Sequence, residues 1–175
     1  MHPALNIMVK AARRASQIIN RASHDIEHLK ITTKQRSDSI IEVLREAYPD
    51  YGILAEESGL SVGEGEGQEY QWIIDPLDGT TNFIHGLPQY SVSIGLTYRG
   101  QLNQAVVYDV TRNEMFTASK GGGAFLNERR IRVTKCLKLE NALLGTGFPY
   151  RVVEHVDAYM GIFKELAQRA SGIRR

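Results

Sequence analysis

Two aspartates three residues apart, Asp75 and Asp78, are the residues whose type and spacing most clearly indicate chemistry in this sequence. They stand in the run Trp-Ile-Ile-Asp-Pro-Leu-Asp-Gly-Thr-Thr-Asn-Phe, which covers residues 72–83. Two carboxylates this close repel each other unless a counter-charge neutralises them, and carboxylate oxygens suit a hard divalent cation. The pair therefore predicts a metal site.

The residues around this pair predict a strand, a tight turn and the start of a helix. Residues 72–74 are aromatic and β-branched, and Pro76 is expected to end their strand just after Asp75 because proline has no amide donor. The Gly-Thr-Thr-Asn segment at 79–82 favours a helix N-terminus whose free amides would bind a phosphate. A loop in which the aspartates bond only their own backbone is the alternative that the short string leaves open.

Composition limits the class of protein. The 175 residues, 42% of them apolar, are enough for one well-buried domain over residues 1–175. A net charge of +1 gives no global basic field, so we expect no direct nucleic-acid binding. Cys136 is the only cysteine and no run approaches the roughly 18 apolar residues of a membrane span, so a cytoplasmic protein that does not bind membranes is expected.

Hydrophobic spacing predicts the elements that position the motif. Apolar residues recur every three to four positions over 2–29, 37–48 and 152–170, which predicts helices there. Apolar and alternating runs predict further strands at 53–56, 90–98, 101–108, 114–119, 124–126 and 141–146. Short turns between strands imply antiparallel neighbours, so the predicted fold class is α+β, a mostly antiparallel sheet with packed helices.

Three other patterns have simpler explanations than a site. His24 and His28 lie one helical turn apart beside Glu27, but no third ligand is near, so a solvated helix face is expected. The alternating glycines and acids of residues 63–67 would repel phosphate, which favours a flexible hairpin connection. Asp157 is embedded in a helical pattern and is not expected to bind a metal.

The longer motif resembles the inositol monophosphatase family of Mg²⁺-dependent, lithium-sensitive phosphatases, most closely its bacterial inositol-1-monophosphatase branch. The resemblance rests on residues 72–83 and on the Ala-Glu-Glu-Ser-Gly run at 55–59, and it extends from about Tyr48 to Phe148. It implies the N-terminal half of the layered αβαβα sandwich of these sugar phosphatases.

Two segments that the resemblance implies do not occur in this sequence. A strand and loop of the form Asp-x-Val-Thr-x-x-Asp is expected between the first two helices, but Lys34–Ser39 runs almost directly into the second helix. Either the protein lacks this loop or the given sequence omits a mobile loop, and we expect the second. The family's second half supplies a Trp-Asp-x-Ala-Ala-Gly motif whose Asp completes the second metal site, and nothing here replaces it. The chain alone is therefore expected to bind a second metal weakly.

The metal ligands are assigned by this resemblance. Glu56, Asp75 and the backbone carbonyl of Leu77 are expected to hold the first Mg²⁺, and Asp75 is expected to bridge to a second ion that Asp78 also holds. A complete site is expected to hold two or three ions. Oxygen ligands without His or Cys favour Mg²⁺ over Zn²⁺. Glu57 is expected to lie behind these ligands without binding the metal.

The catalytic and substrate-binding residues follow from the same resemblance. Thr80 and Glu56 are expected to orient the attacking water, while Asp78 and the amides of Gly79 and Thr80 are expected to bind the substrate at its phosphate. His85 follows the motif closely, and a structural role is expected for it. Positioned divalent metals meet the demand of a reaction that needs accelerations up to about 10²¹-fold.

The resemblance predicts hydrolysis of a small phosphorylated polyol or sugar, with myo-inositol 1-phosphate as the expected substrate and a homodimer as the expected assembly. Fructose bisphosphate, 3′-phosphoadenosine nucleotides and histidinol phosphate are the alternative substrates, because relatives with the same metal motif act on them. A non-catalytic partner of the transcription machinery is the alternative outside enzymes.

Overall fold

The structure is a computed structural model that describes residues 3–23, 29–56, 59–149 and 153–174. It divides the chain into two compact units, residues 1–132 and residues 133–175. The larger unit contains an eight-stranded sheet, and the smaller contains a two-stranded sheet. That residues 1–175 form a single domain stays a prediction.

The larger unit begins with two helices and continues as strands. In chain order its elements are α1 (Pro3–Ala22), α2 (Leu29–Ala47), β1 (Gly52–Ala55), β2 (Gly59–Ser61), the 3₁₀ helix η2 (Gly65–Glu69), β3 (Tyr70–Asp78), α3 (Thr80–Ile84), β4 (Ser91–Tyr98), β5 (Gln101–Asp109), β6 (Glu114–Ser119), β7 (Gly123–Leu126) and β8 (Arg129–Ile131).

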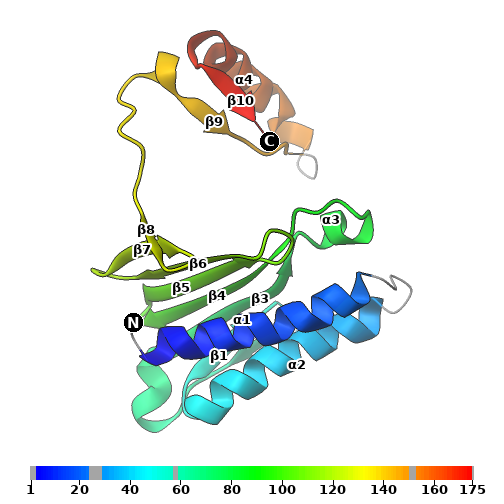
Figure 1. Ribbon diagram of the computed structural model, residues 1–175, viewed down its shortest axis with the longest axis vertical. Coiled ribbons are helices and arrows are strands. Elements are labelled where there is room, and N and C mark those ends of the chain that lie inside the picture. Colours follow the sequence, from blue (N-terminus) through cyan, green and yellow to red (C-terminus); the bar gives the residue numbers. More distant parts are fainter. Residues whose placement is uncertain (1–2, 24–28, 57–58, 150–152, 175) are drawn as a thin grey trace. The chain divides into compact units, whose positions relative to one another are not determined.

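The strands form one sheet in the order β2-β1-β3-β4-β5-β6-β7-β8. Every neighbouring pair is antiparallel except β1 and β3, which are parallel. Helices α1 and α2 lie side by side and pack on the same sheet, α1 on β4 to β6 and α2 on β3 (Figure 1). The predicted α+β class with a mostly antiparallel sheet and packed helices is confirmed.

The core lies between these helices and the sheet. The buried stripe of α1 is rich in alanine, so that Ala11, Ala12 and Ala15 let the helix approach the strands closely. Trp72 is fully buried beneath the helices and is the largest side chain of this core. Its burial fixes the face of β3 and therefore the direction in which the motif residues leave the strand.

Four aromatic side chains close one end of the core. The ring of Tyr51 stacks on that of Tyr70 at 4.4 Å between centroids, and Tyr48 and Trp72 lie within 6 Å of Tyr51. Burial raises the pKa of the Tyr51 hydroxyl, and the neighbouring Tyr70 and Tyr48 raise it further. The neutral phenol is therefore the form that the fold prefers.

The strands between residues 90 and 126 end within about one residue of their predicted limits, but the helices do not. The first helix was expected to reach residue 29 and ends at Ala22; the second begins at Leu29 rather than at Ser37. The segment in which the resemblance predicted a strand and loop, residues 34–39, is helical. His24, Glu27 and His28, for which a solvated helix face and no metal site was predicted, lie outside the described residues.

Residues 63–67 do not form the predicted hairpin connection. They lead through η2 from β2 to β3, and these two strands are not neighbours in the sheet. The glycines allow close packing, because a Cβ on Gly67 would lie 2.3 Å from the carbonyl oxygen of Asp50. Strands β2 and β8 were also not predicted, since each has only three residues and carries little periodicity.

The smaller unit consists of η3 (Leu139–Asn141), β9 (Leu143–Gly145), η4 (Val153–His155), α4 (Val156–Arg169) and β10 (Gly172–Arg174). Strands β9 and β10 pair in parallel, and α4 is the connection between them. Asp157 lies in the first turn of α4, as its helical pattern predicted. None of the described helices is both long and apolar enough to cross a membrane.

Candidate active site

The parallel pairing of β1 and β3 brings two predicted ligands to one edge of the sheet. Ala55 of β1 is paired with Ile74 of β3, so Glu56, just after the end of β1, and Asp75, within β3, follow an aligned pair. Glu56 is exposed and Asp75 is half-buried. Because β1 and β3 are separated by 14 residues, from Gly52–Ala55 to Tyr70–Asp78, only the sheet can place these two carboxylates at the same level.

The strand does not end at Pro76 as predicted. β3 continues to Asp78, and its pairing with β4 is irregular between Asp75 and Asp78. Proline is tolerated there because an irregular pairing leaves no ladder hydrogen bond that needs its missing amide. Within the irregularity, the backbone amide of Leu77 donates to Asp75 Oδ1 at 3.1 Å.

The turn after β3 is tight, and the segment before β4 approaches its backbone closely. Gly79 has φ of 94°, and a Cβ at this position would lie 2.8 Å from the carbonyl oxygen of Gln89 and 3.2 Å from Tyr90 Cα. Thr80 begins α3, and its hydroxyl donates to the carbonyl oxygen of Leu77 at 3.0 Å. Glycine is required here for both conformation and close approach.

This turn forms part of the wall of a cavity of about 440 Å³. Asp78, Gly79 and Asn82 come from the motif, and the other lining residues come from the segment before β4 and from the β5–β6 hairpin. The charged groups of the hairpin that line it are Asp109, Arg112 and Glu114.

Hydrogen bonds connect the walls of this cavity. The amide of Asn82 donates to the carbonyl oxygen of Gln89 at 2.8 Å. The hydroxyl of Thr111 donates to Asp109 Oδ1 at 2.7 Å and also lies 3.2 Å from the carbonyl oxygen of Pro88. Asp109, which is 8% exposed, accepts from the amides of Thr111 and Arg112 through Oδ1 at 2.9 and 3.0 Å. The hairpin is therefore held in a fixed turn facing the motif.

The structure brings together some of the predicted residues and not others. Asp78 and Gly79 line the cavity, whereas Glu56, Asp75, Leu77 and Thr80 are not among its lining residues. His85 Nδ1 lies 2.8 Å from the Thr81 carbonyl oxygen, a contact within α3 and its end. Glu57 lies outside the described residues.

The donor atoms of the site suit a metal ion, but their positions do not form a complete coordination site. The predicted donors are all oxygens, as Mg²⁺ prefers. Within the described ranges, however, no three His, Cys, Asp or Glu side chains gather closely enough to hold an ion. Asp75 instead uses one oxygen for the Leu77 amide. The ligand assignment therefore stays a prediction.

Sequence reasoning missed the contribution of the β5–β6 hairpin. Arg112 was predicted to lie in a turn and Glu114 to begin the next strand, and no role was predicted for Asp109, which follows the strand predicted over 101–108. The Asp-Val-Thr-Arg-Asn order does signal a turn closed by an aspartate. Nothing in it indicates that the turn lies 30 residues away in sequence but across a cavity from Asp78.

Comparison with known proteins identifies the fold. The sequence profile of the inositol monophosphatase family matches residues 1–175. The chain belongs to the inositol monophosphatase family. The resemblance carried by residues 72–83 is thereby confirmed, and family membership supports phosphatase activity in general and dependence on Mg²⁺ in general.

Members of this family from several bacteria are similar to the chain in sequence and in structure. It is 47% identical to the Nus factor SuhB of Pseudomonas aeruginosa, covering 100% of this chain and 69% of that protein. The crystal structure of the extragenic suppressor protein SuhB from Bartonella henselae matches with a TM-score of 0.91 at 34% identity, covering 99% of this chain and 70% of that one. The inositol monophosphatase of Anabaena matches with a TM-score of 0.85 at 36% identity, covering 98% and 65%.

The Pseudomonas alignment also bears on the missing loop. It runs over 188 positions and includes the 175 residues of this chain, so 188 − 175, or about 13, positions of the relative have no counterpart here. The chain is therefore about 13 positions shorter than this relative over the aligned range.

Proposed function

We propose that the protein hydrolyses a small phosphate monoester in the presence of Mg²⁺, with myo-inositol 1-phosphate as its substrate and inositol and phosphate as its products. The observation that carries the proposal is the tight Asp78–Gly79 turn in the wall of a cavity of about 440 Å³, in a chain of the inositol monophosphatase family. A cavity of this size suits a phosphorylated polyol.

Under this proposal, Glu56, Asp75, Asp78 and the carbonyl oxygen of Leu77 would hold the two or three ions of a complete site. Bound Mg²⁺ would neutralise phosphate oxygens and lower the pKa of the attacking water. The ligands would have to gather from their present positions, with Asp75 Oδ1 leaving the amide of Leu77. Thr80 would release or share the Leu77 carbonyl oxygen in the same change.

Thr80 has the contacts that a water-orienting residue needs. Its hydroxyl hydrogen is directed to the Leu77 carbonyl oxygen at 3.0 Å, so the lone pairs of Oγ1 are left to accept a hydrogen bond from water. Glu56, exposed just after the end of β1, would accept a hydrogen bond from the other hydrogen of that water. The amides of Gly79 and Thr80, beside Asp78, would receive the phosphate.

The test is Asp78→Asn, assayed by phosphate release with Mg²⁺ and with EDTA. We expect the Mg²⁺-dependent rate to fall by roughly 10²–10³-fold or more while the far-UV circular dichroism is unchanged, because the exposed side chain carries little of the fold. Asp157→Asn, in the first turn of α4, is the matched control and should retain the parent rate. Normal turnover by Asp78→Asn would exclude the assigned role.

The substrate is decided by a panel measured under the same conditions. We expect myo-inositol 1-phosphate to have the highest kcat/KM, with fructose bisphosphate, 3′-phosphoadenosine nucleotides and histidinol phosphate as competitors. If one of these competitors has a higher kcat/KM, that compound replaces myo-inositol 1-phosphate as the proposed substrate, and the proposed hydrolysis of a phosphate monoester still holds. The proposal includes inhibition by Li⁺, a cytoplasmic location and a homodimer, the last of which light scattering would test.

A second candidate function is suggested by the names of the relatives. The proteins from Pseudomonas aeruginosa and Escherichia coli, 47% and 40% identical, are called Nus factor SuhB. We propose as the alternative that this protein binds the transcription machinery without needing catalysis. Co-purification with transcription proteins that is equal for the parent and Asp78→Asn would support it, and its absence from both would exclude it.

A further inference from the structure

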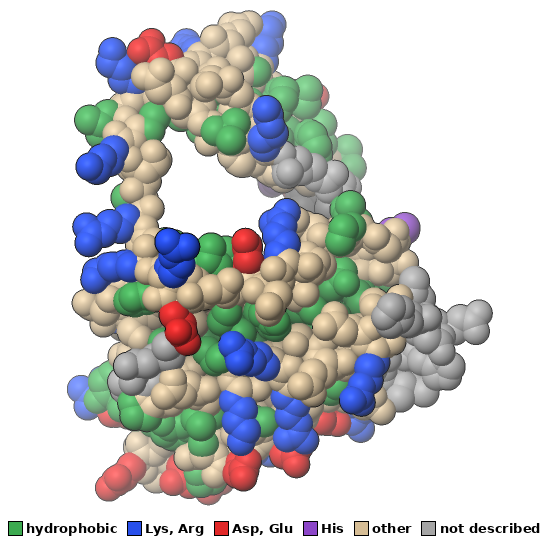
Figure 2. Space-filling model, viewed as in Figure 1, with side chains coloured by type: hydrophobic (Ala, Val, Ile, Leu, Met, Phe, Trp, Pro, Cys, Tyr) green, Lys and Arg blue, Asp and Glu red, His purple; other side chains and the backbone are tan. Residues whose placement is uncertain are grey.

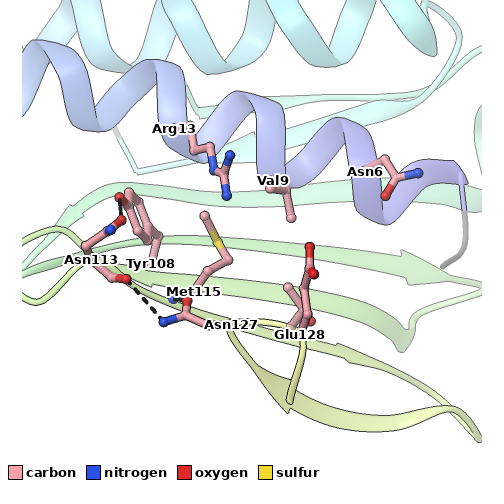
Figure 3. Close-up of a pocket in the computed structure, with 9 residues that line it drawn as sticks. Asn6, Val9, Arg13, Tyr108, Asn113, Met115, Asn127 and Glu128 are labelled. Atoms are coloured by element: carbon pink, nitrogen blue, oxygen red, sulfur yellow. Dashed lines mark hydrogen bonds between the residues drawn. The ribbon is translucent and has the colours of Figure 1, made fainter. Parts of the chain in front are cut away.

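A second hollow lies on the opposite face of the sheet from the cavity at Asp78. It is a groove of about 390 Å³ between α1 and the strands of the larger unit (Figure 3). Tyr108 of β5 lines this groove, whereas its neighbour Val107 lines the cavity at Asp78, and successive residues of a strand point to opposite faces. The two hollows share no lining residue, so a ligand of the groove would leave the proposed phosphatase site untouched.

Two opposite charges lie on opposite walls of this groove. Arg13 points from α1 toward the strands, and Glu128 reaches from the turn between β7 and β8 toward the helix (Figure 3). Among the residues that the structure describes, no ion pair involves either of them, and both are exposed. Arg14, the next residue of α1, is instead paired with Glu42 at 2.6 Å. The groove therefore presents one cation and one carboxylate that no ion pair neutralises.

The turn that carries Glu128 is strained and firmly anchored. Asn127 and Glu128 are its two central residues and have φ of 46° and 67°, where a side chain is unfavourable and Asn-Gly is the usual pair. Asn127 fixes the turn, because its Oδ1 accepts from the Met115 amide and its backbone amide donates to the Met115 carbonyl oxygen, both at 2.9 Å. A glycine would form the same turn at a lower cost, so the turn itself does not account for a glutamate at this position.

Apolar and neutral polar groups line the groove between the two charges. Val9 of α1 and Met115 of β6 supply apolar surface. Asn113 Oδ1 accepts from the Tyr108 hydroxyl at 2.6 Å, which leaves the Asn113 amide nitrogen as a donor, and Asn6 adds a second amide from the helix. The lining therefore suits a ligand that has an apolar part and oxygen atoms that accept hydrogen bonds.

We propose that the groove between α1 and the β7–β8 turn binds a free amino acid with an apolar side chain. The carboxylate of the ligand pairs with the Arg13 guanidinium, its ammonium group pairs with the Glu128 carboxylate, and its side chain lies along Val9 and Met115. Guanidinium and carboxylate groups form strong charge-assisted hydrogen bonds, and a volume of about 390 Å³ is within the range of small-molecule sites.

The two charges select against ligands that carry charge of one sign. A polyanion would be attracted by Arg13 and repelled by Glu128, and a polyamine would meet the reverse. On the face that Figure 2 shows, basic and acidic side chains are interspersed with apolar ones over α1 and the strands beside it. A zwitterion satisfies both charges at once, and the occupied groove has no net charge.

The test is isothermal titration calorimetry of the full chain with L-leucine at neutral pH, beside two analogues that each lack one charge. N-acetyl-L-leucine has no ammonium group and L-leucinamide has no carboxylate. Each should bind at least roughly tenfold more weakly than L-leucine, because each loses a charge-assisted hydrogen bond. Absence of L-leucine binding at millimolar concentrations, or equal binding of the three compounds, would overturn the proposal.

Two substitutions connect each charge of the ligand to one wall of the groove. Glu128→Gln should weaken L-leucine binding at least roughly tenfold and remove its advantage over N-acetyl-L-leucine; Arg13→Gln should do the same for its advantage over L-leucinamide. Arg14→Gln is the matched control, because it removes the same charge from the next position of α1, and it should keep the parent affinity. If Arg14→Gln weakens binding as much as Arg13→Gln, or if both advantages survive, the groove is not the site.

Replacement of Glu128 by glycine separates binding from stability. Glu128→Gly relieves the left-handed backbone, so it should raise the urea midpoint of unfolding while it loses the preference for L-leucine over N-acetyl-L-leucine. A lower midpoint would show that the glutamate serves the turn and would overturn the argument for a ligand. Phosphate release by Arg13→Gln and Glu128→Gln should equal that of the parent, since neither residue lines the cavity at Asp78; a loss would contradict two separate sites.

Discussion

Replacement of Gly79 by alanine tests whether the motif turn is held as tightly as its geometry indicates. A non-glycine residue at φ of 94° costs about 1–2 kcal/mol from backbone strain. The added Cβ would also lie 2.8 Å from the Gln89 carbonyl oxygen and 3.2 Å from Tyr90 Cα, and such overpacking against backbone costs about 1–3 kcal/mol. The expected loss of unfolding free energy is therefore about 2–5 kcal/mol.

Gly86→Ala separates these two contributions. Gly86 also has a positive φ, 68°, but a Cβ there would meet no atom within 4 Å. Only the backbone term applies, so we expect a loss of about 1 kcal/mol. The difference between the two variants measures the steric cost of the contact between Gly79 and the Gln89–Tyr90 segment.

Urea unfolding followed by circular dichroism measures both variants. With a slope of about 2 kcal/mol per molar urea, Gly79→Ala should lower the midpoint by about 1–2.5 M and Gly86→Ala by about 0.5 M. Equal midpoints for the two variants would refute the reasoning, because the close approach would then carry no cost. If Gly79→Ala loses phosphate release but keeps the urea midpoint of the parent, the substitution affects phosphate binding and not the stability of the fold.

The remaining predictions concern other parts of the chain. Asp109→Ala should lower the free energy of unfolding by about 2–4 kcal/mol because the Thr111 and Arg112 amides lose their acceptor. Asp109→Asn, which keeps an acceptor, should cost less than half of that in the same urea assay. Gly161→Ala in α4, where a Cβ meets no atom within 4 Å, should stabilise the helix by about 0.5–1 kcal/mol, and slower amide exchange in α4 would show it. The raised pKa of Tyr51 contributes stability that is fully present below about pH 10 and is lost as pH rises further, so Tyr51→Phe should flatten the fall of the unfolding midpoint above pH 10; an unchanged profile would contradict this.

Local patterns predicted much of the fold and less of the site. Strands β4 to β7 and helix α4 were found because alternation and three-to-four spacing act over neighbouring residues. Pro76 was expected to end β3, and the strand continues past it because the sheet is irregular there. The start of α2 at Leu29 was missed because the apolar spacing that predicted the helix begins at Ile40, and residues 29–36 are mostly polar.

The sequence by itself determined the motif of residues 72–83, the order of the elements and the oxygen chemistry of the predicted ligands, because each depends on residues adjacent in the chain. The tertiary structure alone decided that Asp109 and Asp78 line one cavity and that Arg13 and Glu128 line one groove. These residues are far apart in sequence, and strand pairing and helix packing bring them together. Net charge and periodicity contain no information on such distances.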